Sequence, residues 1–282
     1  MVDQRFIEVN GVRVAYHDEG KGPVLVMLHG SGPGATGWSN YSRNVPELAR
    51  HFRVICPDLP GFGASDVKPV TGAIPGFWAE TIVALLDALG IAKAHFVGNS
   101  MGGMITLKIA LEHPERIARM VLMGPGGGFP VTAQWPSPGI VNLVTFYEGD
   151  GPTLEKVRFF IEQAVFDRSV ITPELLAERL EAALDPRIAA QPPMRPGPAG
   201  PPEELWRDPR LARLPHEVLI LWGREDRILP LDTGFTFMKQ IPRARLLVMP
   251  QCGHWVQWEH AQEFNEQVAL FLQAATHDKG DA

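Results

Sequence analysis

The sequence is poor in cysteine, with only Cys56 and Cys252 among its 282 residues. Two cysteines provide neither a disulfide framework nor a metal-ligand spacing, so we expect two unpaired thiols in a reducing compartment. Cys56 lies in an apolar run and is expected to be buried in a strand. Cys252 precedes His254 by two residues, which predicts a position close to the functional site described below.

Long apolar runs are also missing. No stretch approaches the roughly 18 to 20 apolar residues of a membrane span. The first residues, Met1 to Arg5, lack the apolar core of a signal peptide, so a cytoplasmic location is expected. The net charge of -6 argues against a broad nucleic-acid-binding surface. Hydrophobic residues make up 45% and charged residues 21%, which is typical of a globular chain long enough for one large domain.

Short apolar runs alternate with helical patterns, and no internal repeat is present. This alternation predicts a mostly parallel sheet with helices on both faces. Asn10-Gly11 is a hairpin turn signal, so the first two strands are expected to be antiparallel. The expected strands are 6–9, 12–17, 23–28, 53–56, 95–98, 120–123, 218–222 and 246–249. The expected helices outside the insertion described next are 79–89, 101–112 and 259–275.

The stretch from about 126 to 215 interrupts the alternation. It contains helical patterns at 154–166 and 173–184, and a run rich in proline and glycine from 191 to 202. An insertion of this length between two buried strands is too long for a plain loop. We interpret 126–215 as a mostly helical lid, and 1–125 with 216–282 as the core domain. Recurrent proline excludes a regular helix in 189–202.

The strongest motif is Gly98-Asn99-Ser100-Met101-Gly102, which matches the G-x-S-x-G nucleophile elbow. It follows an expected strand and opens an expected helix, which is the context that the motif needs. The serine must lie in a sharp turn, and the two glycines remove side chains that would obstruct it. The helix N-terminus also presents N–H groups to developing negative charge. Ser100 is therefore the predicted nucleophile.

A serine hydroxyl needs an adjacent base, and the base needs an orienting acid. His254 lies between the last expected strand and the last expected helix, where the chain returns to the carboxyl edge of the sheet. Asp226 follows the strand 218–222, and the order serine, aspartate, histidine is the one expected for a sheet with this elbow. Glu225 is the competing acid. We prefer Asp226 and interpret Glu225 as a solvated loop charge.

A glycine-rich loop, His29-Gly30-Ser31-Gly32-Pro33-Gly34, follows the expected strand 23–28. We expect it to form an oxyanion hole, with the backbone N–H groups of Ser31 and Met101 as donors. Nucleotide binding is disfavoured, because the Walker lysine is absent and the glycines do not open a helix in the dinucleotide pattern.

The elbow and the glycine-rich loop, taken with Trp38-Ser39-Asn40, Leu122-Met123-Gly124-Pro125-Gly126-Gly127 and Cys252-Gly253-His254-Trp255, resemble the meta-cleavage product hydrolases. These are carbon–carbon bond hydrolases of bacterial aromatic and steroid catabolism. The resemblance covers nearly the whole chain and is weakest between about 185 and 214. It implies an α/β-hydrolase fold, with a mostly parallel eight-stranded sheet, helices on both faces and a mostly helical lid.

The resemblance also implies an activity. Members of the family convert 2-hydroxy-6-oxohexa-2,4-dienoates to 2-hydroxypenta-2,4-dienoate and a carboxylic acid, using a Ser-His-Asp triad after enol-to-keto tautomerisation. Neither a metal ion nor an organic cofactor is implied, and the partners are a small dienoate and other copies of the chain in a homodimer or larger oligomer. Neither nucleic acid nor a membrane is an expected partner.

By the same resemblance Arg179 would bind the substrate carboxylate, with Asn40, Asn99 and Trp255 nearby. A planar guanidinium suits bidentate carboxylate binding. The residues taken alone also allow plainer interpretations: Arg179 as a solvated charge on a lid helix, Asn40 as a helix cap and Trp255 as a core aromatic.

Two other functions stay open. A carboxylesterase on the same scaffold would carry the same triad, although it gains nothing from a carboxylate clamp. A non-catalytic ligand receptor would bind without turnover. The C6 substituent of a dienoate stays open as well, as does the choice between an acyl-enzyme and base-assisted attack by water. Trp135, Phe146 and Phe166 are candidates for an apolar subsite and equally for the core of the lid.

Overall fold

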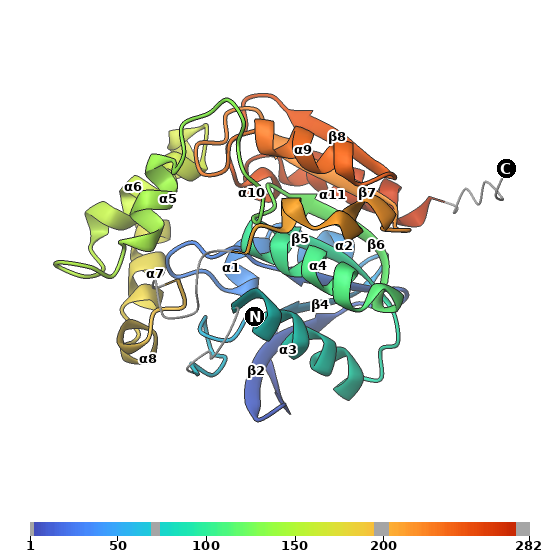
Figure 1. Ribbon diagram of the computed structural model, residues 1–282. Helices are drawn as coiled ribbons and strands as arrows, with labels where there is room; N and C mark the ends of the chain where they lie inside the picture. The colour runs from blue at the N-terminus through green and yellow to red at the C-terminus, as the bar shows by residue number, and fades with distance from the viewer. Residues whose placement is uncertain (1–2, 69–73, 195–202, 275–282) are drawn as a thin grey trace, which may run out of the picture.

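A computed structural model of the chain describes residues 3–68, 74–194 and 203–274. An eight-stranded sheet runs through the centre of the molecule (Figure 1), in the strand order β1-β2-β4-β3-β5-β6-β7-β8. The strands are β1 (Arg5–Val9), β2 (Val12–Glu19), β3 (Val24–Leu28), β4 (Arg53–Pro57), β5 (Ala94–Asn99), β6 (Ile117–Met123), β7 (Val218–Gly223) and β8 (Ala244–Met249).

The pairing of these strands confirms the mostly parallel sheet predicted from the sequence. Strand β2 is antiparallel to both β1 and β4, and every other neighbouring pair is parallel. Asn10 and Gly11 turn the chain between β1 and β2 with φ values of 51° and 70°, the conformation that makes Asn-Gly a hairpin signal. Because the central strands are parallel, their carboxyl ends meet at one edge of the sheet.

Helices cover both faces of the sheet, as the uninterrupted apolar strands require. Helices α3 (Ile74–Ala88) and α4 (Met101–Glu112) contribute to the larger apolar core on one face. Helices α2 (Val45–Leu48) and α11 (Ala261–Gln273) contribute to a second core on the other face. The remaining helices near the sheet are α1 (Gly37–Tyr41), α9 (Asp232–Gln240), α10 (Val256–Glu259), and the short 3-10 turns Pro114–Arg116, Leu205–Arg207 and Pro209–Arg213.

The closing helix predicted over 259–275 is confirmed as α11 (Ala261–Gln273), which begins two residues later than predicted. Helix α10 ends at Glu259 and α11 begins at Ala261, with a bend at His260, whose φ of -115° and ψ of 46° are not helical. The His260 imidazole reaches back to the carbonyl of Gln251 at 3.1 Å. This local contact lies at the break between α10 and α11. Residue 275 lies outside the described residues.

In the described residues between β6 and β7, four α-helices stand together beside the sheet (left in Figure 1), and we call them the lid helices. Helix α6 packs against both α5 and α7. Thr153 and Thr172 cap the N-termini of α6 and α7 through their side-chain oxygens. The lid helices are α5 (Pro138–Val144), α6 (Leu154–Ala164), α7 (Pro173–Ala183) and α8 (Pro186–Ala190), with a 3-10 turn at Arg168–Val170.

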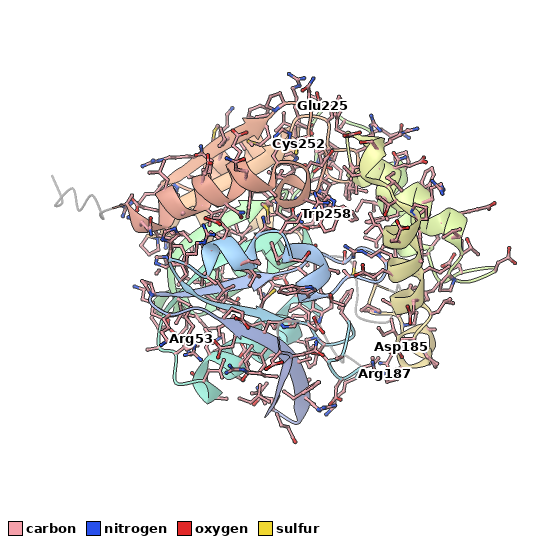
Figure 2. The ribbon with its side chains drawn as sticks, turned by 180° about the vertical axis from the view of Figure 1, so that it is seen from behind. Arg53, Asp185, Arg187, Glu225, Cys252 and Trp258 are labelled. Atoms are coloured by element: carbon pink, nitrogen blue, oxygen red, sulfur yellow. The ribbon has the colours of Figure 1, made fainter. Side chains whose placement is uncertain are left out.

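The far end of the lid is tied to the loop after β4. In Figure 2 the labelled Asp185 and Arg187 lie together at this end. Arg187 pairs with Asp185 at 2.7 Å and donates to the carbonyl of Gly63 at 3.0 Å. Of the proline-rich run, 191–194 follow α8 without forming a helix, and 195–202 lie outside the described residues. No helix in the described part of the chain combines the length and apolar character needed to cross a membrane.

Candidate active site

Ser100 occupies the turn between β5 and α4, at the carboxyl edge of the sheet. Its φ of 54° and ψ of -112° are unusual for a residue with a side chain. The surrounding contacts hold it there, since its N–H donates to the Met123 carbonyl at 2.8 Å. A Cβ on Gly98 would collide with the Gly102 carbonyl, and one on Gly102 would collide with the Leu28 carbonyl. The glycines of the motif are therefore required by close backbone packing.

His254 and Asp226 are in direct contact. The imidazole Nδ1 lies 2.7 Å from Asp226 Oδ2, and both side chains are buried. The other carboxylate oxygen accepts the N–H groups of Ile228 and Leu229 at 2.8 and 2.9 Å. An acceptor at Nδ1 selects the tautomer that leaves Nε2 free to take a proton. That Nε2 is buried and has no hydrogen-bond partner among the described residues.

Glu225, the competing acid, makes different contacts. Its carboxylate pairs with Arg224 at 2.7 Å and accepts the N–H of Cys252 at 3.1 Å. Figure 2 shows Glu225 and Cys252 close together, beyond the ends of β7 and β8. Burial raises the pKa of the Cys252 thiol well above its usual range, so this cysteine stays protonated at neutral pH.

A small cavity brings the predicted residues together. Of the nine proposed for catalysis, the oxyanion hole and substrate binding, seven line it. The two exceptions are Asp226, which contacts His254 from the opposite side of the ring, and Met101, the first residue of α4. The seven are Ser31, Asn40, Asn99, Ser100, Arg179, His254 and Trp255.

Arg179 places a cation in this cavity. It is only 2% exposed, and its guanidinium makes one long hydrogen bond, to the Ser39 carbonyl at 3.4 Å. Its Nε has no partner among the described residues, and the group lies 5.1 Å from the ring centre of Trp255. Burial lowers its pKa to about 10, so it remains charged at neutral pH. A buried and poorly paired guanidinium favours an incoming anion, and a carboxylate matches its geometry.

Two amide side chains in the cavity also have unpaired atoms. Within the described residues, the Nδ2 atom of Asn40 and the Oδ1 atom of Asn99 are buried without hydrogen-bond partners. The Nδ2 atom of Asn99 donates to the carbonyl of His254 at 3.4 Å. Buried polar atoms are rarely left unpaired in proteins, so a donor and an acceptor here favour a polar ligand.

His29 holds the glycine-rich loop in place, a role that we did not assign from the sequence. Its Nδ1 donates to the Gly30 carbonyl at 2.7 Å and its Nε2 accepts the Leu59 N–H at 2.9 Å. Burial lowers the pKa of His29, which favours this neutral ring. The loop places Ser31 at the cavity, and Met101 stands in the first turn of α4, where N–H groups lack intrahelical acceptors.

A second small cavity adjoins the first. Both are lined by Ser31 and Leu143, and the wall of the second is mostly apolar. Phe146 lines this second cavity. Phe166 is 38% exposed, and Trp135 packs against Phe129 with ring centres 6.2 Å apart. Of the three aromatic candidates for an apolar subsite, Phe146 is the one that the structure places at either cavity.

Three further residues at the site were not recognised in the sequence, and Gly124, which belongs to the motif 122–127, was given no role there. Leu143, Phe160 and Ile228 line the first cavity. A Cβ on Gly124, whose φ is 44°, would lie 3.1 Å from the His254 ring. For Gly124, the signal in the sequence was a glycine directly after an expected strand. Leu143 and Phe160 carry none, since apolar residues on lid helices look alike whether they face a cavity or the core.

Comparison with known proteins gives consistent matches. Residues 23–261 match a family model described as the alpha/beta hydrolase fold. A 2-hydroxy-6-oxononadienedioate/2-hydroxy-6-oxononatrienedioate hydrolase of Burkholderia vietnamiensis is 43% identical over 93% of this chain and 91% of its own length. A 2-hydroxy-6-oxo-6-phenylhexa-2,4-dienoate hydrolase of Burkholderia cepacia is 41% identical over 95% and 96%.

Solved structures agree with these matches. The 2-hydroxy-6-oxo-6-phenylhexa-2,4-dienoate hydrolase of Rhodococcus sp. strain RHA1 superposes with a TM-score of 0.85, at 34% identity over 97% of this chain and 99% of that one. A meta-cleavage product hydrolase of Pseudomonas fluorescens IP01 gives 0.84, at 34% identity over 95% and 97%. The similarity therefore includes both the core and the lid.

Proposed function

Because the chain belongs to the α/β-hydrolase family and, within it, to the meta-cleavage product hydrolases, we propose that it hydrolyses the C5–C6 bond of 2-hydroxy-6-oxohexa-2,4-dienoates. The products are 2-hydroxypenta-2,4-dienoate and a carboxylic acid. One observation carries the proposal beyond a general esterase: a buried, poorly paired Arg179 shares a cavity with Ser100 and His254. A neutral ester gains nothing from that cation, whereas a dienoate carboxylate would pair with it.

The reaction has two stages. First, the dienol becomes its keto tautomer by moving the enol proton to C5, while Arg179 holds the carboxylate. The unpaired atoms of Asn40 and Asn99 are the candidates for holding the 2-oxygen. The keto form matters because the C5 fragment can then leave as a carbanion stabilised by conjugation with the C2 carbonyl.

Second, the elements of water add across the C5–C6 bond. His254 Nε2 takes a proton from the attacking hydroxyl, and Asp226 stabilises the resulting imidazolium. The N–H groups of Ser31 and Met101 stabilise the oxyanion that forms at C6. As the bond breaks, its electron pair passes through C4 and C3 to the 2-oxygen, which takes up a proton to give the 2-hydroxydienoate, and C6 becomes the carboxylic acid. If Ser100 attacks, an acyl-enzyme forms and water releases it. If water attacks directly, Ser100 only orients it.

The two relatives differ, by their names, in the C6 group: one name specifies phenyl, the other an acid with a second carboxylate. We propose an uncharged, apolar C6 group for this chain. Arg179 is the only lysine or arginine among the described residues that line the two cavities. A second buried carboxylate would have no cation to pair with, which is costly.

Three broader proposals accompany this assignment. Residues 1–125 and 216–282 form the core, and 126–215 form a lid that supplies Leu143, Phe160 and Arg179 to the cavity. The enzyme works in the cytoplasm without a metal ion or organic cofactor, and it assembles as a homodimer or larger homo-oligomer. Sedimentation equilibrium tests the assembly, since a single species of monomer mass at micromolar concentration would contradict it.

The test of the activity is spectrophotometric. Wild type and Ser100→Ala are mixed with 2-hydroxy-6-oxo-6-phenylhexa-2,4-dienoate and with a neutral aryl ester. We expect rapid loss of the yellow dienolate, with formation of hydroxypentadienoate and benzoate, and loss of this turnover in the variant. Ester cleavage without turnover of dienoates bearing several C6 groups would identify a carboxylesterase instead. Binding of the dienoate without turnover of either compound would identify a receptor.

A further inference from the structure

The loop that carries His254 is held to the lid by one carboxylate. Glu259, the last residue of α10, accepts the N–H of Gly253 on Oε2 at 2.7 Å. Its other oxygen, Oε1, accepts the N–H groups of Phe166 and Asp167 at 2.7 and 2.9 Å, just beyond the C-terminus of lid helix α6. The carboxylate therefore bridges two segments that lie about 90 residues apart in the chain.

A second set of hydrogen bonds joins the same two segments, with the donors now on the His254 loop and the acceptor on the lid. The carbonyl of Ala164, the last residue of α6, accepts the N–H of His254 at 2.7 Å and that of Trp255 at 3.3 Å. The two backbones approach so closely that a Cβ on Gly253 would lie 2.5 Å from the Ala164 carbonyl oxygen. The backbone on which the His254 ring stands is therefore bonded directly to the lid.

The same lid helix forms part of the cavity wall. Phe160, one turn before the end of α6, lines the cavity, and its ring centre lies 6.5 Å from that of Trp255. A shift of α6 would therefore move the cavity wall and the backbone of His254 together. Such a shift would change the 2.7 Å contact between His254 and Asp226.

The geometry of the bridge, with N–H donors on both oxygens, suits an ionised carboxylate. Glu259 is half-buried, and it is held by three backbone N–H donors. Burial raises its pKa, and the N–H donors oppose that rise. Hydrogen bonds to a charged acceptor are roughly twice as strong as neutral ones.

We propose that Glu259 is a positioning residue for the catalytic base: by bridging Gly253 to the end of α6, its carboxylate fixes the His254 ring between Asp226 and Ser100. It touches neither substrate nor the reacting atoms. This inference rests on the proposed role of His254 as general base, and it adds a coupling between the lid and that base.

The test compares Glu259→Gln with Glu263→Gln. Glutamine keeps the size of the side chain, but one of its two ends becomes an NH2 group that must face an N–H donor. Glu263 is a matched control on the first turn of α11, because its side chain is 52% exposed and it reaches only His260, at 3.8 Å. Each variant is assayed with the 6-phenyl dienoate and with a neutral aryl ester, since both reactions need His254.

We expect Glu259→Gln to lower kcat by about tenfold to a hundredfold on both compounds, with KM changed by less than about threefold. The downfield proton resonance of His254 Nδ1–H should broaden, and the amides of Phe166, Asp167 and Gly253 should exchange faster with solvent. Glu263→Gln should match wild type. Glu259→Asp keeps the charge on a shorter side chain, so it should fall between wild type and Glu259→Gln and serves if the glutamine variant does not fold.

The proposal is overturned if Glu259→Gln folds, loses thermal stability and keeps both kcat and the Nδ1–H resonance, because Glu259 is then only structural. A variant in which only KM changes, with kcat as in wild type, would also overturn the proposal. The assignment of the substrate can fail separately. If wild type cleaves only the ester, and Glu259→Gln lowers that rate as expected, the dienoate reaction is excluded and the positioning role stands.

Discussion

Replacing Arg179 with methionine should weaken binding of the dienoate and raise the free energy of unfolding of the empty protein. The side chain is 2% exposed, and its guanidinium makes one long hydrogen bond to the Ser39 carbonyl. A pKa lowered from 12.5 to about 10 corresponds to about 3 kcal/mol disfavouring the charged form in the empty site. This is the net cost, after the nearby Glu178 carboxylate has offset part of the effect of burial. Methionine fills a similar volume without a charge to desolvate.

Substrate binding should weaken while the empty protein becomes more stable. Removing one partner of a buried, hydrogen-bonded charge pair costs about 2 to 5 kcal/mol, which corresponds to a loss of roughly 30-fold to 4,000-fold in kcat/KM for the dienoate. The free energy of unfolding should rise by about 1 to 3 kcal/mol, because the variant no longer buries a poorly paired cation. A neutral aryl ester, which has no carboxylate, should be cleaved at nearly the wild-type rate.

The assay measures kcat and KM for the 6-phenyl dienoate and the aryl ester, and urea unfolding gives the stability. Arg158→Met is the control, since Arg158 is exposed on lid helix α6 and the same change there removes an exposed charge. Equal losses on both compounds would refute the reasoning, because they would show general damage to the site. An unchanged KM for the dienoate would also refute it, since Arg179 would then not bind the carboxylate.

Three further predictions follow from the described contacts. Asp226→Asn should lower kcat by about ten-thousandfold on any substrate: the amide oxygen stays with the N–H groups of Ile228 and Leu229, so the NH2 faces His254 and forces the wrong tautomer. A kcat within tenfold of wild type would contradict the assigned triad. Burial lowers the pKa of His95 to about 4. As the pH is lowered from 6.5 to 4, the unfolded chain therefore takes up a proton that the folded protein does not. The free energy of unfolding decreases by about 1 to 2 kcal/mol over this range, after allowance for partial exposure. His95→Gln should flatten that slope in urea titrations, and an unchanged slope would exclude this origin. Finally, a dienoate with a phenyl group at C6 should have a kcat/KM at least about tenfold above that of one with a 2-carboxyethyl group, because the second carboxylate would be buried unpaired. Equal values for the two would contradict an apolar C6 site.

Local sequence was sufficient for much of the fold. Continuous apolar runs predicted the buried parallel strands, because a strand covered on both faces needs no polar side. Asn10-Gly11 predicted the hairpin, since that turn needs left-handed residues. The bend at His260 was not predicted, and the imidazole there bonds to the carbonyl of Gln251, nine residues earlier. Helical spacing of apolar residues continues across such a bend without a break.

The residues of the site also differ in whether the sequence alone could identify them. Ser100 was recognisable because a strained turn restricts its neighbours to glycine, and Asp226 and His254 because both follow strands that end at one edge of the sheet. Arg179 was ambiguous as a sequence feature, since Glu174 and Glu178 precede it on the same helix and a solvated ion pair was the plainer interpretation. The side chain is only 2% exposed and lies against Trp255, which resolves the ambiguity. This burial arises only when the lid helices pack on the core.

The sequence by itself determined which residues form the strands and the elbow, and it predicted the order of the proposed triad, because those signals depend on neighbours within a few positions. Tertiary structure alone decided that the His29 imidazole clamps the glycine-rich loop and that Glu259 joins the catalytic loop to α6. Both side chains bond to backbone N–H or carbonyl groups, which every residue carries. A partner of that kind leaves no trace in the sequence, and folding must bring it into contact before it can be identified.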